Sequence, residues 1–400
     1  MLKTNETINK SVYQSNLNKV LVETVLTSIG AGFSVAVITY FWNLIGMDQT
    51  AIGFVQMMFT VVVCLLDIPM GYIADRFNRK VLNIIGDIGV ALTFVLYAFS
   101  QNMYMVLLSE CLLGLFMAMT NGVDQSFIKY NCDKIDETGE LFKKMNIKVH
   151  MARYIALLGV TFVGGIIAKF SIRVCIGISF VPYFIGGLIS FIIKDYNGKL
   201  EAKHKNPIKD MVTSIKEIMK VKETRLMLAG VIFGKEITHA QIWVFTPMLM
   251  MVGVPIEIVS VGWVLNYLMQ VVGAKISTRF IHSKVSKRFI TPVLLEFAWM
   301  AILSIHVNIV TVWLFALNGF VHGLLDGNMM TSLQETAKAE IQTSVLSVAS
   351  TGARLLYIPL VYVINYLGNI DLRLALVGVC VIFLPFCMLT YVKLRKMERR

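Results

Sequence analysis

The sequence contains few charged residues and little that is typical of a soluble domain. Asp, Glu, Lys and Arg make up 16% of its 400 residues, against roughly 25% in soluble globular proteins. The first 19 residues lack the apolar core of a secretory signal peptide, so we expect the first hydrophobic segment to stay in the chain as a helix. The composition excludes a soluble enzyme, a nucleic-acid-binding domain and a disulfide-stabilised secreted domain.

Motifs for nucleotide and metal chemistry are also missing. The six cysteines form no C-x-x-C pair, and all but Cys132 lie in apolar runs, which is typical of small core residues. No G-x-x-x-x-G-K-(S/T) phosphate loop occurs, because Gly234-Lys235 lacks the required spacing. We therefore expect neither a metal, ATP nor nucleic acid among the ligands.

Apolar residues dominate the chain. Ala, Val, Ile, Leu, Met, Phe, Trp, Tyr and Cys make up 56% of it, and the mean hydropathy is +0.69. An apolar stretch of roughly 20 residues spans a bilayer as a helix. The sequence therefore predicts an all-α integral membrane protein with twelve transmembrane helices. The predicted spans are residues 20–42, 50–73, 81–100, 103–129, 149–169, 171–193, 226–250, 256–281, 289–306, 311–337, 342–367 and 371–392.

The basic residues indicate how these helices are oriented. The connections after predicted helices 1, 3, 7, 9 and 11 contain no Lys or Arg, whereas those after helices 2, 4 and 6 are strongly basic. About 30 of the 37 basic residues fall on one side of the membrane, and Lys169, Arg173 and Arg373 fall on the other. By the positive-inside rule the basic side is cytoplasmic, so we expect both termini in the cytoplasm.

One charged linker divides the chain into two sets of six helices. Residues 194–225 contain nine basic and five acidic residues, and 208–221 have amphipathic helical spacing. Two repeated halves are common in transporters; two unrelated bundles fused together are the alternative. The expected segments are a cytoplasmic N-terminal segment 1–19, a bundle 20–193, a cytoplasmic linker 194–225, a bundle 226–392 and a basic cytoplasmic tail 393–400.

A motif that combines glycine with charges follows the second predicted helix. Residues 71–80 read Gly-Tyr-Ile-Ala-Asp-Arg-Phe-Asn-Arg-Lys. This segment resembles the G-x-x-x-D-R-x-G-R-(R/K) signature of the major facilitator superfamily, with Asn78 in place of a glycine. The matching residues are Gly71, Asp75, Arg76, Arg79 and Lys80. The resemblance implies a major facilitator fold, transport by alternating access, and a conformational switch in this loop.

The flanking sequence is similar to one branch of that family. Asp67 and Pro69 lead into the motif as in small bacterial exporters and drug-efflux members, which implies that Asp67 belongs to the switch. Two residues depart from the branch: Asn121 replaces a serine of its S-G-x-(D/E) stretch, and Glu110 replaces the basic residue that many members have in the fourth helix. The alternative for the motif is a basic loop that only sets topology.

Ionisable residues in the predicted spans are the strongest candidates for function, because a charge at mid-span costs about 2.5–3.5 kcal/mol. Glu236 and His239 are three residues apart, and His322 and Asp326 are four apart, so each pair shares a helix face. A carboxylate beside an imidazole can change protonation near neutral pH. The proton-coupling candidates are Glu236, Asp326, Glu296, His239 and His322. The substrate or counter-charge candidates are Arg354, Lys235, Glu110, Trp243 and Tyr357. For each charged residue, a static ion pair is the alternative.

These observations predict a secondary transporter that needs no cofactor beyond a proton gradient. One charge crossing 100 mV supplies about 2.3 kcal/mol. Following the family resemblance, we expect proton antiport that exports an amphipathic small molecule, a drug or an antibiotic or peptide natural product. The first alternative is a proton symporter for a small polar or anionic nutrient. A membrane-embedded enzyme or a non-transporting sensor is a further alternative.

The expected partners are the lipid bilayer and a small-molecule or peptide substrate, and the expected state is a monomer in a bacterial inner membrane. An enzyme would need a catalytic cluster at one membrane face. The one acidic cluster at the cytoplasmic face is interleaved with lysines and favours a solvated loop; it consists of Asp133, Asp136, Glu137 and Glu140.

Overall fold

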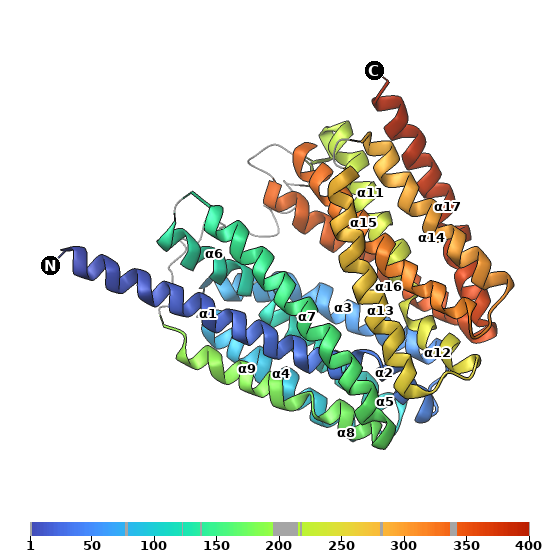
Figure 1. Cartoon of the computed structure of the whole chain (residues 1–400), viewed down its shortest axis with the longest axis horizontal. Helices are drawn as coiled ribbons and strands as arrows, with labels where there is room; N and C mark the ends of the chain where they lie inside the picture. Colours follow the sequence, from blue (N-terminus) through green and yellow to red (C-terminus); the bar gives the residue numbers. More distant parts are fainter. Residues whose placement is uncertain are drawn as a thin grey trace. The chain divides into compact units, whose positions relative to one another are not determined.

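The computed structural model of this chain describes residues 2–76, 79–121, 123–136, 138–194, 215–216, 218–280, 283–336 and 342–399. Every regular element in these ranges is a helix, which confirms the predicted all-α class (Figure 1). The contacts group the chain into two units. Unit 1 comprises Met1–Ile38 and Leu65–Lys205, and unit 2 comprises Thr39–Cys64 and Asn206–Arg400. The bundle boundaries given above stay a prediction, and residues 195–214 of the linker lie outside the described residues.

Long helices packed side by side form unit 1. The helix α1 runs beside α7 and α9, and α4 packs against α5 and α9 (Figure 1). These helices are α1 (Leu2–Val35), α4 (Arg79–Ala98), α5 (Met103–Thr120), α6 (Val123–Ile135), α7 (Glu140–Phe170), α8 (Ile172–Gly177) and α9 (Phe180–Ile192). The helix α3 (Gln49–Arg76) begins in unit 2 and ends in unit 1.

Unit 2 is built in the same way. The helix α14 runs along α17, and α15 lies against α11 and α13. Its helices are α2 (Ile38–Leu44), α11 (Lys222–His239), α12 (Ile242–Met251), α13 (Ile256–Ser277), η1 (Thr278–Phe280), α14 (Val285–Ile305), η2 (Thr311–Phe315), α15 (Ala316–Thr336), α16 (Gln342–Ile370) and α17 (Leu372–Met397). Three glycines allow the backbones of α13 and α15 to pack closely against each other: Gly273 on α13, and Gly319 and Gly323 on α15. A Cβ atom at any of these positions would clash with a backbone carbonyl of the other helix.

In the described part of the chain, ten helices are long and apolar enough to cross a membrane. The predicted spans 226–250 and 311–337 are the two that no such helix covers. The first is divided between α11 and α12, and the second begins as the 3₁₀ helix η2 before α15. Both segments contain ionisable residues at mid-helix, among them Lys235 and Asp326, which lower their mean hydropathy. The multi-pass membrane fold is therefore confirmed, and the number twelve stays a prediction.

Two predicted spans are interrupted at corresponding places in the two sequence halves. The first is broken between Val35 and Ile38, and the seventh between His239 and Ile242. Each break is two residues long, and hydrogen bonds from the Val37 N–H to the Ser34 carbonyl and from the Ala240 N–H to the Glu236 carbonyl close the end of the preceding helix. Irregular backbone at membrane depth is tolerated where it is buried in protein or lines a cavity. Interrupted helices in corresponding positions of two halves indicate where a transporter binds its ligands.

Candidate functional site

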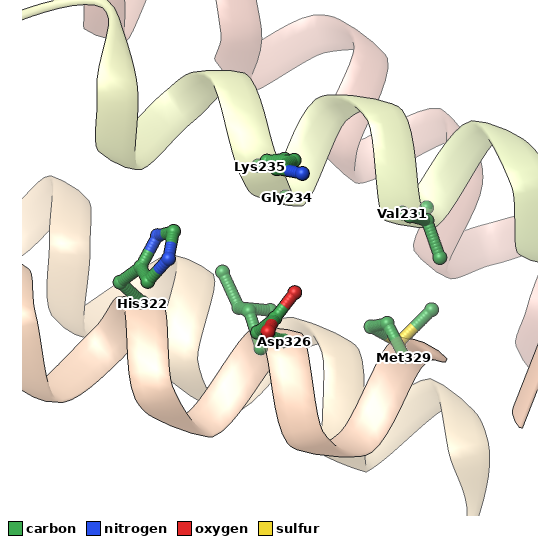
Figure 2. A pocket seen from close by; sticks show the side chains of 8 residues that line it. Val231, Gly234, Lys235, His322, Asp326 and Met329 are labelled. Atoms are coloured by element: carbon green, nitrogen blue, oxygen red, sulfur yellow. The ribbon is translucent and has the colours of Figure 1, made fainter. Parts of the chain in front are cut away.

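Ionisable residues from α11 and α15 line a small cavity inside unit 2 (Figure 2). Lys235 comes from α11, His322 and Asp326 come from α15, and Gly234 and Met329 also line the cavity. The cavity volume is about 10 Å³, which is space for about one water molecule. The structure thus brings together three of the residues that the sequence predicted for coupling or counter-charge.

Lys235 and Asp326 face each other across this cavity (Figure 2). Lys235 is half-buried and Asp326 is exposed, and among the described residues no ion pair joins their side chains. Charges at this depth are costly unless water or a ligand compensates them. The cavity between the two side chains is where such compensation can occur.

His322 is held from the opposite helix by a residue that sequence reasoning missed. The Nδ1 atom of His322 lies 2.8 Å from the hydroxyl oxygen of Thr238. Thr238 is buried on α11, and its hydroxyl also donates to the backbone carbonyl of Lys235 at 2.9 Å. A threonine has no charge that would mark it in a hydrophobic segment, so only the packing of α11 against α15 identifies it.

Aromatic side chains surround the break between α11 and α12. The ring centroids of His239 and Tyr357 are 4.8 Å apart, and Nε1 of Trp243 donates to the hydroxyl of Tyr357 at 2.6 Å. Trp42 packs on Trp243 at 5.4 Å between centroids. His239 is exposed, whereas Tyr357 is buried. The structure therefore joins three predicted candidates, His239, Trp243 and Tyr357, in one aromatic cluster.

A second set of polar contacts adjoins this cluster. Nε2 of Gln49 donates to the Asn365 side chain at 2.7 Å and to the backbone carbonyl of Trp243 at 2.9 Å. The backbone N–H of Gln49 donates to the side chain of Asn369 at 3.3 Å. Sequence reasoning also missed these amides, although a polar side chain inside a span is itself a signal for contact between helices.

Glu296 and Glu236 are buried away from this cavity wall. Glu296 on α14 is fully buried, where it accepts hydrogen bonds from Gln241 at 2.7 Å and from Trp299 at 2.8 Å. Glu236 is 3% exposed, and its Oε2 atom has no hydrogen-bond partner in the described part of the chain. Since His239 is exposed and Glu236 is buried, the two side chains lie in different environments.

The remaining candidates lie elsewhere. Arg354 is half-buried on α16. Glu110 is buried on α5 in unit 1, where it accepts a hydrogen bond from the Tyr97 hydroxyl at 2.5 Å. A second buried carboxylate of unit 1, Glu23, accepts from Ser190 at 2.9 Å and also from Asn83.

Part of the signature loop is visible in unit 1. Asp67 accepts a hydrogen bond from Asn121 at 2.9 Å, which joins two residues that the sequence had linked to the same family branch. Lys80 donates to the backbone carbonyls of Phe191 and Ile193 at 2.6 and 2.9 Å, so its ammonium group caps the C-terminal end of α9. Arg79 is half-buried at the start of α4. The surroundings of Gly71, the side chains of Asp75 and Arg76, and residues 77–78 lie outside the described part of the chain.

The acidic cluster at residues 133–140 is not one solvated loop: Asp133 lies in α6, Glu140 begins α7, and Asp136 stands between the two helices. The Asp136 carboxylate accepts from the Thr138 hydroxyl at 2.7 Å, from the Leu141 N–H at 3.0 Å and from the Thr138 N–H at 3.0 Å. These hydrogen bonds, with the Thr138 hydroxyl first, lower the pKa of Asp136 below its ordinary value of 3.8. Asp136 therefore orders the first turn of α7; Glu137 lies outside the described residues.

Comparisons with known proteins agree with this architecture. Residues 21–359 match the family model described as Major Facilitator Superfamily. An uncharacterized MFS-type transporter of Methanocaldococcus jannaschii is 24% identical over 182 residues, which cover 45% of this chain and 45% of that protein. The match thus spans less than half the length of that relative.

Two solved structures have the same fold. The nucleoside transporter NupG superposes with a TM-score of 0.74 at 13% identity, covering 96% of this chain and 99% of that chain. A bacterial homolog of the human lysosomal transporter Spinster, in an inward-facing and unoccupied conformation, gives a TM-score of 0.73 at 13% identity over 96% of this chain and 98% of that chain. At this identity the likeness shows the fold alone.

Proposed function

The chain belongs to the Major Facilitator Superfamily, and from this premise we propose that it is a proton-coupled secondary transporter that exports an amphipathic small molecule by antiport. The family makes it a multi-pass membrane transporter rather than an enzyme. The proton gradient, the direction and the substrate class are our proposal.

The cavity between α11 and α15 is the observation that carries this proposal. Lys235, His322 and Asp326 line one cavity that is large enough for about one water molecule. Within the described part of the chain, the side chains of Lys235 and Asp326 do not form an ion pair with each other. A static ion pair would instead hold its two charges in direct contact. An imidazole and a carboxylate one helical turn apart form a site where a proton can be gained and lost.

The aromatic cluster supports an amphipathic substrate. His239, Trp243 and Tyr357 offer aromatic surface together with polar edges, beside the interrupted helix of the seventh span. Such rings can bind the apolar part of a ligand while a polar group of the same ligand reaches the charged side chains of Lys235 and Asp326. The export direction rests on the exporter-like lead-in at Asp67 and Pro69.

Uptake of a small polar solute by proton symport is the second candidate function. Lys235 and His322 on the cavity wall favour it, because their side-chain nitrogens can bind the hydroxyl, carbonyl or anionic groups of such a solute. The nucleoside transporter NupG, which has the same fold, is consistent with such a substrate.

Both candidates share a setting that we also propose. The protein acts in the inner membrane of a bacterial cell with both termini in the cytoplasm, because the basic connections fall on that side. It works as a monomer, with no cofactor and no ATP. Its conformational switch includes Asp67, Gly71, Asp75, Arg76, Arg79 and Lys80.

Proton flux in inside-out vesicles tests the proposal. Vesicles containing the protein are energised to an acidic interior, and a pH-sensitive dye follows proton release on addition of cationic, neutral and anionic amphiphiles, sugars and nucleosides. Asp326→Asn and Glu236→Gln are compared with Asp371→Asn, a matched change at the exposed N-cap of α17.

Export by antiport predicts substrate-dependent proton release that both Asp326→Asn and Glu236→Gln weaken and that Asp371→Asn leaves unchanged. Symport moves the proton and the solute in the same direction, so proton release that requires nucleosides or sugars loaded inside the vesicles, and not added outside them, would favour the second candidate. Transport that responds to no proton gradient would contradict proton coupling.

A further inference from the structure

Thr238 makes two short contacts with one hydroxyl group. Its oxygen lies 2.9 Å from the backbone carbonyl of Lys235, three residues earlier on α11, and 2.8 Å from Nδ1 of His322 on α15. The residue is 2% exposed, so water does not compete for either contact. Both distances are within hydrogen-bond range.

A hydroxyl has only one hydrogen to donate. A carbonyl oxygen cannot donate, so the contact with Lys235 is a hydrogen bond only if Thr238 supplies the hydrogen. The contact with His322 is then a hydrogen bond only if the ring supplies one from Nδ1. This assignment is the one that gives both contacts a hydrogen, and it requires a hydrogen on Nδ1 whether the ring is neutral or charged.

The consequence concerns the other ring nitrogen. A neutral imidazole with its hydrogen on Nδ1 has a free lone pair on Nε2. Figure 2 shows the ring on the cavity wall next to Asp326, which lies one turn further along α15, with Lys235 on the opposite helix. The charges of Asp326 and Lys235 both act on His322.

Titratable groups also occur on the helices packed against α15. Those within the predicted spans include Lys235, Glu236 and His239 on α11, Tyr267 on α13, Glu296 on α14, and Arg354 and Tyr357 on α16. Of these, Glu296 is engaged with Gln241 and Trp299. Asp326 and Lys235 are the charged residues that line the same cavity as His322.

We propose that Thr238 is a positioning residue that keeps the hydrogen of His322 on Nδ1, so that the ring gains and loses its second proton at Nε2, on the cavity shared with Asp326 and Lys235. The link to coupling rests on the proton-coupled transport proposed above. The protonation form itself does not depend on transport and can be measured separately.

Nitrogen NMR of the full-length protein in lipid nanodiscs, with ¹⁵N-labelled histidine, shows directly which ring nitrogen of His322 carries the hydrogen. The chain has six histidines, and the difference from the spectrum of His322→Asn identifies the signals of His322. We expect a protonated-type Nδ1 and an unprotonated-type Nε2 at high pH, with the Nε2 signal moving on acidification. Thr238→Ser should keep this form, and Thr238→Val should lose it. An unprotonated Nδ1 in the unmodified protein, or the same form in Thr238→Val, would overturn the assignment.

The vesicle assay then tests the role in coupling. Thr238→Val has nearly the same shape as threonine without the hydroxyl, and we expect it to lower substrate-driven proton release roughly 100-fold, the lower end of the range for a misplaced proton-transfer group. Thr238→Ser should restore the rate and its pH profile. A purely packing role predicts the reverse order, because valine fills the site better than serine.

The two experiments separate the two proposals. If no compound drives proton movement but the NMR result holds, proton coupling fails and the assignment of Thr238 stands. If proton movement is normal in the unmodified protein and unaffected in Thr238→Val, the positioning role fails and proton coupling stands.

Discussion

Gln49 and Asn365, separated by 316 residues in the sequence, are joined by a buried hydrogen bond of 2.7 Å between their side chains. Asn365 uses its own Nδ2 group on the carbonyl of Val361 at 2.7 Å, which leaves its Oδ1 for Gln49. The second donation of Gln49, to the carbonyl of Trp243, fixes the amide from both sides. The start of α3 is thereby attached to α12 and α16 within unit 2.

Gln49→Leu should therefore destabilise the protein. The change leaves the Asn365 oxygen and the Trp243 carbonyl without their donor, and each buried unsatisfied group costs about 1–3 kcal/mol. Thermal unfolding in detergent measures the loss. Gln101→Leu is the control, because Gln101 is exposed beyond the end of α4. Equal melting temperatures for the two variants would contradict the proposed attachment.

Gly234→Ala should inhibit transport with little effect on folding. An added Cβ would lie 3.6 Å from Leu325, an ordinary contact, but it would stand on the wall of a cavity of about 10 Å³. We expect stability to change by less than about 1 kcal/mol, whereas substrate-driven proton release falls. Gly159→Ala is the matched control, since nothing lies within 4 Å of a Cβ there. Normal transport in Gly234→Ala would show that the cavity is not used.

Lys80→Met separates a structural from a switching role for one signature residue. Loss of the ammonium group leaves the Phe191 and Ile193 carbonyls at the end of α9 without their donor, which should cost about 0.3–1 kcal/mol of stability from the helix-end charge. Lys80→Arg should retain most of this stabilisation, because arginine keeps the positive charge. Thermal unfolding of the two variants measures the difference. A variant with unchanged stability but lost transport would indicate switching alone.

The stability of the first turn of α7 should depend on pH through Asp136. Its lowered pKa means that the folded state favours the carboxylate, so its stabilisation is complete above the ordinary value of 3.8 and is lost as the pH falls through the lower folded value. In Asp136→Asn, the Leu141 amide should exchange its hydrogen faster at neutral pH. The difference from the unmodified protein should shrink at pH values below the folded pKa. A difference that is constant with pH would contradict the role of the carboxylate.

Much of the fold could be predicted from the sequence, because hydrophobic length and basic connections specify membrane helices directly. His322, Asp326 and Lys235 could be selected for the same reason: a charge inside a span is conspicuous. Thr238, Gln49 and Asn365 could not, since their importance depends on which helices face each other. The break before Ile242 also gave no local signal, because the nearest proline, Pro247, lies inside α12. Only the packed structure showed Glu236 buried and His239 exposed, although their spacing predicts a common face.

Unit 2 is discontinuous in the sequence, since it combines Thr39–Cys64 with Asn206–Arg400. At a synthesis rate of about 5–20 residues per second, the ribosome reaches Asn365 about 15–60 s after Gln49. The earliest membrane segments thus acquire some of their final neighbours only near the end of translation. During that interval the side-chain amide of Gln49 lacks its partner Asn365 and has to be solvated by lipid headgroups, by water or by the insertion machinery. A nascent chain that stops before α16 cannot complete unit 2, however well its own helices have been inserted.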